Sequence, residues 1–403
     1  MGTGFLGGLF RSRSRSLADK AEELLTVRGE ASAVARAAEI LEDYAALDAK
    51  GRQGFLGILA EAFAADPVRV AEAIAEYQSR PDPISTRHLH DAAEPRRQEL
   101  LRRLNLAPGG TAALVRMRED VLRQLPGSPD LRPVDADFSH LFASWFNRGF
   151  LVLRRIDWQT PAAVLEKLIR YEAVHEINGW PDLRRRLDPP DRRCFGFFHP
   201  ALADEPLIFV EVALTREIPG AIVPLLDAKR ESLDARRATT AVFYSISNCQ
   251  PGLRGISFGN FLIKQVVEDL RRDLPQLKTF VTLSPVPGFA AWLKGARGAD
   301  TPEGQPALTR AIARYLLEAK AKNGKPLDPV ARFHLGNGAR LERVNWLGDP
   351  SAKGIREAAG FMVNYLYDLD RIERNHEQFE NRDTVVASRH VERLLRARDG
   401  VPD

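Results

Sequence analysis

The chain has 403 residues, with 58 lysines and arginines against 54 aspartates and glutamates, and a formal net charge of +4. Its apolar fraction of 44% and charged fraction of 28% are typical of a globular protein, and its length predicts two domains that each bury a core. The weak basic excess comes with no RNP, helix-turn-helix or zinc-finger motif, so it favours an arginine-rich solvated surface over nucleic-acid binding. Because no apolar run reaches about 18 residues, we expect no membrane-spanning helix.

The N-terminus and the cysteines bear on the compartment. Residues 1–16 contain a short apolar stretch followed by alternating Arg and Ser, and are predicted to form a disordered tail, since the apolar part is too short for a signal peptide. Cys194 and Cys249 lie too far apart for a C-x-x-C motif, and two cysteines do not make a disulfide scaffold. We therefore expect a reducing compartment.

Residues 17 to about 125 are predicted to be helical almost throughout, because Ala, Leu, Glu and Arg dominate and apolar residues recur three and four positions apart. The predicted helices are Ala18–Val27, Ala33–Asp48, Lys50–Ala64, Pro67–Gln78, Ala93–Asn105 and Gly110–Gln124. His88 and His90 have no carboxylate or thiol at ligand spacing, so we interpret them as surface or interface histidines rather than as a metal site. Residues 1–134 are therefore predicted to form a first domain, a helical bundle that serves assembly or covers one side of a second domain.

A second domain is predicted over residues 135–403, after a Pro- and Gly-rich linker at Pro126–Pro133. A short aromatic helix at Phe138–Arg148 leads into β-rich runs that alternate with helices. The predicted strands are 150–153, 195–198, 207–214, 241–246 and 279–282, and the predicted helices are 161–172, one that begins at 259, 307–321 and 355–367. Since the run at 207–214 is so continuously apolar, both of its faces are expected to be buried. The second domain is therefore predicted to be mixed α/β.

The segment Thr239–Leu293 is the most informative part of this domain, because it predicts a strand, a glycine-containing turn and an amphipathic helix in succession. Backbone amides at the start of such a helix suit a phosphate group. The turn has neither a G-x-G-x-x-G nor a Walker motif, so glycines that merely turn the chain are the competing interpretation.

Two further segments carry candidate catalytic side chains. Ser284 stands in a rigid turn, Leu283–Phe289, at the end of a predicted strand, where open sheets commonly place ligand contacts. His334 stands beside glycines in Arg332–Ala339. Taken alone, the serine predicts a turn hydroxyl and the histidine a packed side chain. Tyr367, at the end of the predicted helix 355–367, is open to a core or a site role.

Six motifs in order make a specific pattern: FYSIS, GISFGNFLIK, LSPVPGF, RFHLGNGA, RVNWLGDPSAKG and MVNYLY. Together they resemble the malonyl-CoA decarboxylase family, from about Trp145 to Tyr367, and the helical first half fits as well. The resemblance implies a helical oligomerisation domain, forming a dimer or tetramer, and a catalytic domain of the GCN5-related acetyltransferase type. It also implies conversion of malonyl-CoA to acetyl-CoA and carbon dioxide.

The resemblance assigns roles to individual residues. Ser284 and His334 match the family's catalytic pair, and Tyr367 matches a tyrosine near the site. The CoA-binding turn corresponds to Arg254, Gly255, Ile256, Ser257, Phe258, Gly259 and Asn260. Ser257 departs from the pattern, since some members have a glutamate there. The peroxisomal tail of the family is missing, which implies a cytoplasmic protein.

The chemistry of the substrate sets the cofactor expectation. When malonyl-CoA loses carbon dioxide, the thioester carbonyl accepts the electron pair as an enolate, so no metal, pyridoxal phosphate, thiamine or biotin is expected. Two other functions remain open. The same CoA turn can serve transfer of an acyl group to an amine, or belong to a CoA-binding scaffold without catalysis. Nucleic-acid binding ranks last.

Overall fold

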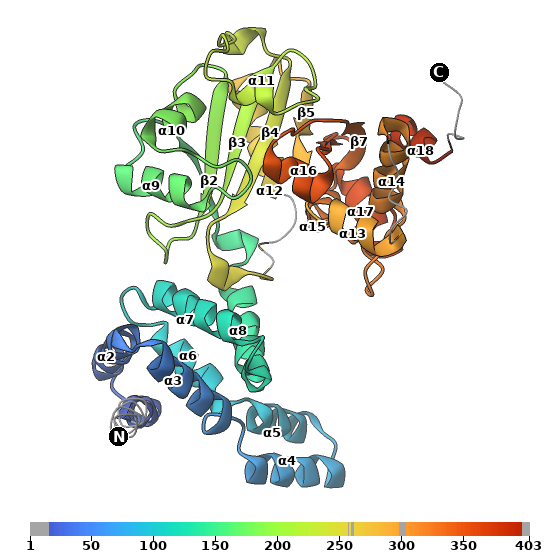
Figure 1. The fold of residues 1–403 in the computed structure, drawn as a ribbon. Helices are drawn as coiled ribbons and strands as arrows, with labels where there is room; N and C mark the ends of the chain where they lie inside the picture. The colour runs from blue at the N-terminus through green and yellow to red at the C-terminus, as the bar shows by residue number, and fades with distance from the viewer. Residues whose placement is uncertain (1–15, 257, 259–261, 298–303, 397–403) are drawn as a thin grey trace, which may run out of the picture. The chain divides into compact units, whose positions relative to one another are not determined.

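The fold divides into two compact units (Figure 1). The computed structural model describes residues 16–256, 258, 262–297 and 304–396. The first unit comprises Met1–Phe150, His199–Ala203 and Gln250–Phe258, and the second comprises Leu151–Phe198, Asp204–Cys249 and Gly259–Asp403.

The first unit is helical. A helix over residues 16–26 is followed by α2 (Glu30–Ala46), α3 (Ala49–Glu61), α4 (Pro67–Ser79), α5 (Pro83–Ala93), α6 (Arg96–Leu104), α7 (Gly110–Gln124), η1 (Pro129–Leu131), α8 (Arg132–Trp145), η2 (Arg148–Phe150) and η4 (Pro251–Leu253). Phe55, Leu100, Leu114 and Phe138 from four of these helices are fully buried. Within the described part of the chain, no helix has the length and apolar character that a membrane crossing needs.

Two proline-containing segments of this unit begin helices. The Pro81–Pro83 segment begins α5, because the Asp82 side chain accepts a hydrogen bond from the Ser85 amide and the Asp82 amide donates to the Ser85 hydroxyl oxygen, forming a capping box. The predicted linker Pro126–Pro133 runs into η1 and α8, since a proline is tolerated in the first turn of a helix.

The second unit is built on a mixed sheet of eight strands among the described residues: β1 (Val152–Ile156), β2 (Arg192–Phe198), β3 (Pro206–Thr215), β4 (Thr240–Asn248), β5 (Thr279–Thr282), β6 (Ser284–Pro285), β7 (Arg340–Asn345) and β8 (Met362–Leu366). Strands β1 to β4 pair antiparallel in chain order, and β5 joins β4 parallel. β3 is buried along nearly its whole length, as its unbroken apolar run predicted. The prediction of a helical region followed by a mixed α/β region is thus confirmed.

Helices cover the sheet and extend beyond it. These are α9 (Ala162–Tyr171), α10 (Trp180–Leu187), α11 (Val223–Leu226), η3 (Ala235–Arg237), α12 (Leu262–Asp273), α13 (Phe289–Arg297), α14 (Gln305–Leu317), α15 (Pro329–Gly336), α16 (Ala352–Ala358), α17 (Ile372–Arg382) and α18 (Arg389–Arg396). In Figure 1, α9 and α10 lie over the sheet near β2, where Leu165 and Leu183 share one core with Phe198. The buried stripe of α12 appears at the predicted helical spacing.

The helix predicted over 355–367 is wrong in its second half. α16 ends at Ala358, because Ala359 and Gly360 both take positive φ angles, 51° and 80°, which a helix cannot continue through. The next residues form β8. At Val363, β8 pairs with Ser284 of β6 and with Val344 of β7, so β8 lies between these two strands. MVNYL is therefore an internal strand, and Tyr367 directly follows it.

Candidate active site

Three separate elements bring Ser284, His334 and Tyr367 together. The Leu283 amide still donates to the Phe243 carbonyl of β4, but Ser284 pairs with Val363 of β8 instead. The chain thus stops pairing with β4 after Leu283 and pairs with β8 at Ser284. α15 begins at Pro329, where the Asp328 side chain accepts the Ala331 amide at 2.8 Å, and it carries His334 in its last turn.

Ser284 and His334 are in direct contact. The Ser284 Oγ lies 3.1 Å from His334 Nε2 and donates to the Thr282 Oγ1 at 2.8 Å. The Thr282 Oγ1 also accepts the Tyr365 amide at 3.0 Å. Ser284, His334 and Thr282 are 5%, 3% and 0% exposed, so these hydrogen bonds hold the side chains in one buried arrangement.

The other imidazole nitrogen contacts the predicted tyrosine. His334 Nδ1 lies 2.8 Å from the Tyr367 hydroxyl oxygen, and the imidazole stacks on the Tyr365 ring with centroids 4.7 Å apart. Burial lowers the pKa of His334 to about 3, so its imidazole is neutral near pH 7. Burial also raises the pKa of the Tyr367 phenol well above its ordinary value, so Tyr367 keeps its proton.

A buried amide network supports the floor of this site. The Asn364 Nδ2 donates to the Thr282 carbonyl at 2.7 Å, and the Asn345 Nδ2 donates to the Asn364 Oδ1 at 2.8 Å. Arg343 Nε donates to both Asn345 and Asn364. The two asparagines thus fix the strand position of Thr282, while Asn337 donates to the Phe333 carbonyl within α15.

The described residues of the predicted CoA turn belong to the first unit. Gly255 has a φ of 82°, Arg254 is exposed, and Ile256 and Phe258 are buried. Ser257, Gly259 and Asn260 lie outside the described residues.

An arginine that the sequence did not single out anchors this turn. Arg118 of α7 is 3% exposed and donates from Nη1 to the carbonyls of Gly252 and Arg254, at 2.7 and 3.0 Å. Its Nε donates to Asp135 at 2.8 Å. A side chain on Gly252 would collide with the Val115 backbone of α7, so η4 approaches this helix as only a glycine permits.

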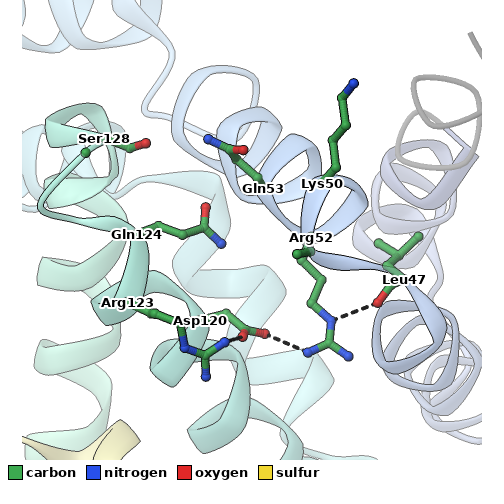
Figure 2. A pocket seen from close by; sticks show the side chains of 10 residues that line it. Leu47, Lys50, Arg52, Gln53, Asp120, Arg123, Gln124 and Ser128 are labelled. Carbon is green, nitrogen blue, oxygen red and sulfur yellow. Dashed lines mark hydrogen bonds and ion pairs between the residues drawn. The ribbon is translucent and has the colours of Figure 1, made fainter. Parts of the chain in front are cut away.

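Other polar features lie apart from these residues. A pocket of about 890 Å³ in the first unit lies between α3 and α7 (Figure 2), where Arg52 and Arg123 both donate to Asp120. In the second unit, Glu211 of β3 is fully buried and accepts from Arg186 at 3.1 Å. Burial and the neighbouring Glu172 raise the pKa of Glu211, against the opposing effect of Arg186.

Thr282, Tyr365 and Arg118 were missed by reading the sequence. Thr282 had a usable signal, since it stands two residues before Ser284 in a strand and therefore on the same face. Arg118 had none, because the Gly252 and Arg254 carbonyls to which it donates lie 134 and 136 residues farther along the chain. Among the described residues, no group of three or more His, Cys, Asp or Glu side chains is placed to hold a metal ion.

Comparison with known proteins gives consistent matches over nearly the whole chain. The family model described as the malonyl-CoA decarboxylase C-terminal domain matches residues 149–304 and 301–401, and the model of the N-terminal domain matches residues 63–146. A mitochondrial malonyl-CoA decarboxylase from Anser anser anser is 36% identical over 88% of this chain and 82% of its own length.

Solved structures agree with these matches. The crystal structure of malonyl-CoA decarboxylase from Rhodopseudomonas palustris has a TM-score of 0.91 and 56% identity, covering 94% of this chain and 99% of that one. The enzyme from Cupriavidus metallidurans has a TM-score of 0.77 and 38% identity, with coverages of 95% and 99%. The chain therefore belongs to the malonyl-CoA decarboxylase family.

Proposed function

We propose that the chain converts malonyl-CoA to acetyl-CoA and carbon dioxide, as a carbon–carbon lyase, at Ser284 and His334. Its family membership supports the reaction. The observation that supports the site is the 3.1 Å contact between Ser284 Oγ and His334 Nε2, two buried side chains.

The reaction requires the protein to stabilise an enolate and to protonate a carbon atom. The bond between the carboxylate carbon and Cα breaks, and its electron pair moves into the thioester as an enolate. A hydrogen-bond donor must stabilise the enolate oxygen, and an acid must protonate Cα. Preorganised donors in a buried site contribute about 3 kcal/mol each to such steps. In our proposal, the His334 Nε2 proton is the acid, and the Ser284 hydroxyl either orients the malonyl carboxylate or relays the proton.

CoA recognition is proposed for the turn Arg254, Gly255, Ile256, Ser257, Phe258, Gly259 and Asn260. Backbone amides that open a helix favour a pyrophosphate. Arg118 donates hydrogen bonds to the Gly252 and Arg254 carbonyls. These two bonds support a fixed backbone conformation at the start of the turn. The exposed guanidinium of Arg254 supplies a positive charge for the CoA phosphates. Tyr367 is proposed to bind the substrate indirectly, through His334.

No metal, pyridoxal phosphate, thiamine or biotin is part of the proposal. The thioester itself accepts the electron pair that decarboxylation releases, so the chemistry needs no further electron sink. The expected result is that treatment with a strong chelator leaves turnover unchanged.

The test uses malonyl-CoA without any acyl acceptor. The wild-type chain is expected to release acetyl-CoA and carbon dioxide, whereas an amine acyltransferase would release neither and a CoA scaffold would bind without turnover. Ser284→Ala and His334→Ala are expected to lower kcat by roughly 10²–10⁴-fold with little effect on CoA affinity. His376→Ala is the matched control, because His376 also lies beside α15 but contacts the Gly336 carbonyl. Wild-type turnover in His334→Ala would refute the assignment.

Self-association and location complete the proposal. We place a homo-oligomer interface, dimeric or tetrameric, on the helical unit, which agrees with the exposed apolar side chains of α4 and α5: Val68, Ile74, Tyr77 and Ile84.

A cytoplasmic location agrees with two buried free thiols, Cys194 and Cys249, that form no disulfide. Imaging of the tagged chain in its own cell tests the location.

A further inference from the structure

The Ser284–His334 pair is part of a longer hydrogen-bonded row. Its members are the Tyr367 hydroxyl, the two imidazole nitrogens of His334, the Ser284 hydroxyl and the Thr282 hydroxyl, joined by contacts of 2.8, 3.1 and 2.8 Å. All four residues are at most 5% exposed. Bulk water therefore does not compete for these hydrogen bonds in the resting protein.

Counting protons along the row gives it a direction. A hydroxyl has one proton to donate. The Ser284 hydroxyl donates to Thr282 Oγ1, which also accepts the Tyr365 amide. The contact between Ser284 and His334 must then be a donation from Nε2 to the serine oxygen, because the serine proton is already engaged.

The direction continues through the imidazole. A neutral imidazole carries one N–H, so a proton on Nε2 leaves Nδ1 as an acceptor. Tyr367 retains its phenolic proton and lies 2.8 Å from Nδ1, where it can donate. The row thus runs from Tyr367 to His334, to Ser284 and to Thr282, with each group donating to the next.

We propose that Thr282 is a positioning residue that holds the His334 proton on Nε2, the nitrogen that faces Ser284. It does so by accepting the serine hydroxyl, which leaves the serine oxygen open to the imidazole. This inference rests on the proposed role of Ser284 and His334. It adds a residue that touches neither imidazole nitrogen and acts through the serine.

Without the Thr282 oxygen, the row reverses. The serine hydroxyl loses its acceptor and turns its proton toward Nε2, which becomes the acceptor. The imidazole proton then moves to Nδ1 and donates to the Tyr367 oxygen. In that arrangement, Nε2 has no proton to deliver to the substrate carbon.

Three variants separate this role from a structural one. Thr282→Val keeps the shape and removes the oxygen, and Thr282→Ser restores the oxygen. Thr240→Val is the matched control, since Thr240 is 2% exposed on the adjacent strand β4 and takes no part in the row. Thr282→Val is expected to lower kcat on the order of 10- to 100-fold with KM nearly unchanged, whereas Thr282→Ser and Thr240→Val stay within about threefold of the wild type.

The second readout is the imidazole itself. Solid-state NMR with isotope-labelled histidine distinguishes a proton on Nε2 from one on Nδ1, and a His334→Gln sample identifies the signal. The wild type is expected to carry the proton on Nε2, and Thr282→Val on Nδ1. A wild-type Nδ1 proton would overturn the proposal even if Thr282→Val failed to fold, and so would a Thr282→Val enzyme with wild-type kcat.

These outcomes are separate from those that test the proposed function. The tautomer is measured without substrate, so it stands whether or not malonyl-CoA is turned over. If His334→Ala keeps full activity, the proposed catalytic pair fails. If His334→Ala is inactive but Thr282→Ser is as impaired as Thr282→Val, the pair stands and the role of Thr282 fails.

Discussion

Two buried histidines make the protein sensitive to acid. Burial lowers the pKa of His334 to about 3 and that of His175 to about 4, whereas both ionise near 6.5 in the unfolded chain. Below about pH 6.5, the unfolded chain takes up protons that the native chain does not. The free energy of unfolding is therefore expected to fall with decreasing pH, by about 1.4 kcal/mol per pH unit for each histidine, until the native pKa values are reached.

Urea unfolding near pH 7 and near pH 5 measures this dependence. His334→Gln removes one titrating group, so its free energy of unfolding is expected to fall less between the two pH values than that of the wild type. His88→Gln serves as the control, because the His88 side chain is 54% exposed. An unchanged pH dependence in His334→Gln would show that His334 is not buried in neutral form.

At the scale of elements, the contact of α7 with η4 predicts an effect on substrate binding. Arg118→Lys keeps a charge but loses the planar fork that reaches the carbonyls of Gly252 and Arg254 together with Asp135. We expect KM for malonyl-CoA to rise about tenfold while kcat changes little, since Arg118 contacts neither residue of the proposed catalytic pair. Arg116→Lys, an exposed position on the same helix, is the control. A lowered kcat with normal KM would contradict a role for this turn in CoA binding.

The elements also show what the sequence can predict. The strand β3 and the helix α12 were predicted because their apolar patterns are local. β8 was predicted as helix, since its residues follow a helical stretch and the two positive φ angles at Ala359 and Gly360 depend on packing around them. For the site, motif resemblance pointed to Ser284, His334 and Tyr367, and the strand spacing could have placed Thr282 on the face of Ser284. The contacts of Tyr365 become visible only when β5, β8 and α15 are placed in space.

For the whole molecule, the exposed face of α4 and α5 predicts self-association. Ile84 is 58% exposed and Val68 is 64% exposed, and only Ala73 of α4 is buried. A charge at such a position removes apolar area from an interface and adds a desolvation cost. Ile84→Asp is expected to shift the mass measured by light scattering toward the monomer at micromolar concentration. Leu106→Asp, another exposed apolar position at 61%, should leave the mass unchanged. If neither variant changes the mass, the interface lies elsewhere.

The place of β8 in the sheet has a consequence for how the protein is made. β8 lies between β6 and β7 and supplies Asn364 and Tyr365, with Tyr367 directly after it. During synthesis, β4, β5 and β6 leave the ribosome long before Met362, so the edge that β8 will cover stays open meanwhile. The row of hydrogen bonds at His334 is completed only when this late strand inserts. A chain that ends before β8 would carry Ser284 and His334 without the strand that aligns them.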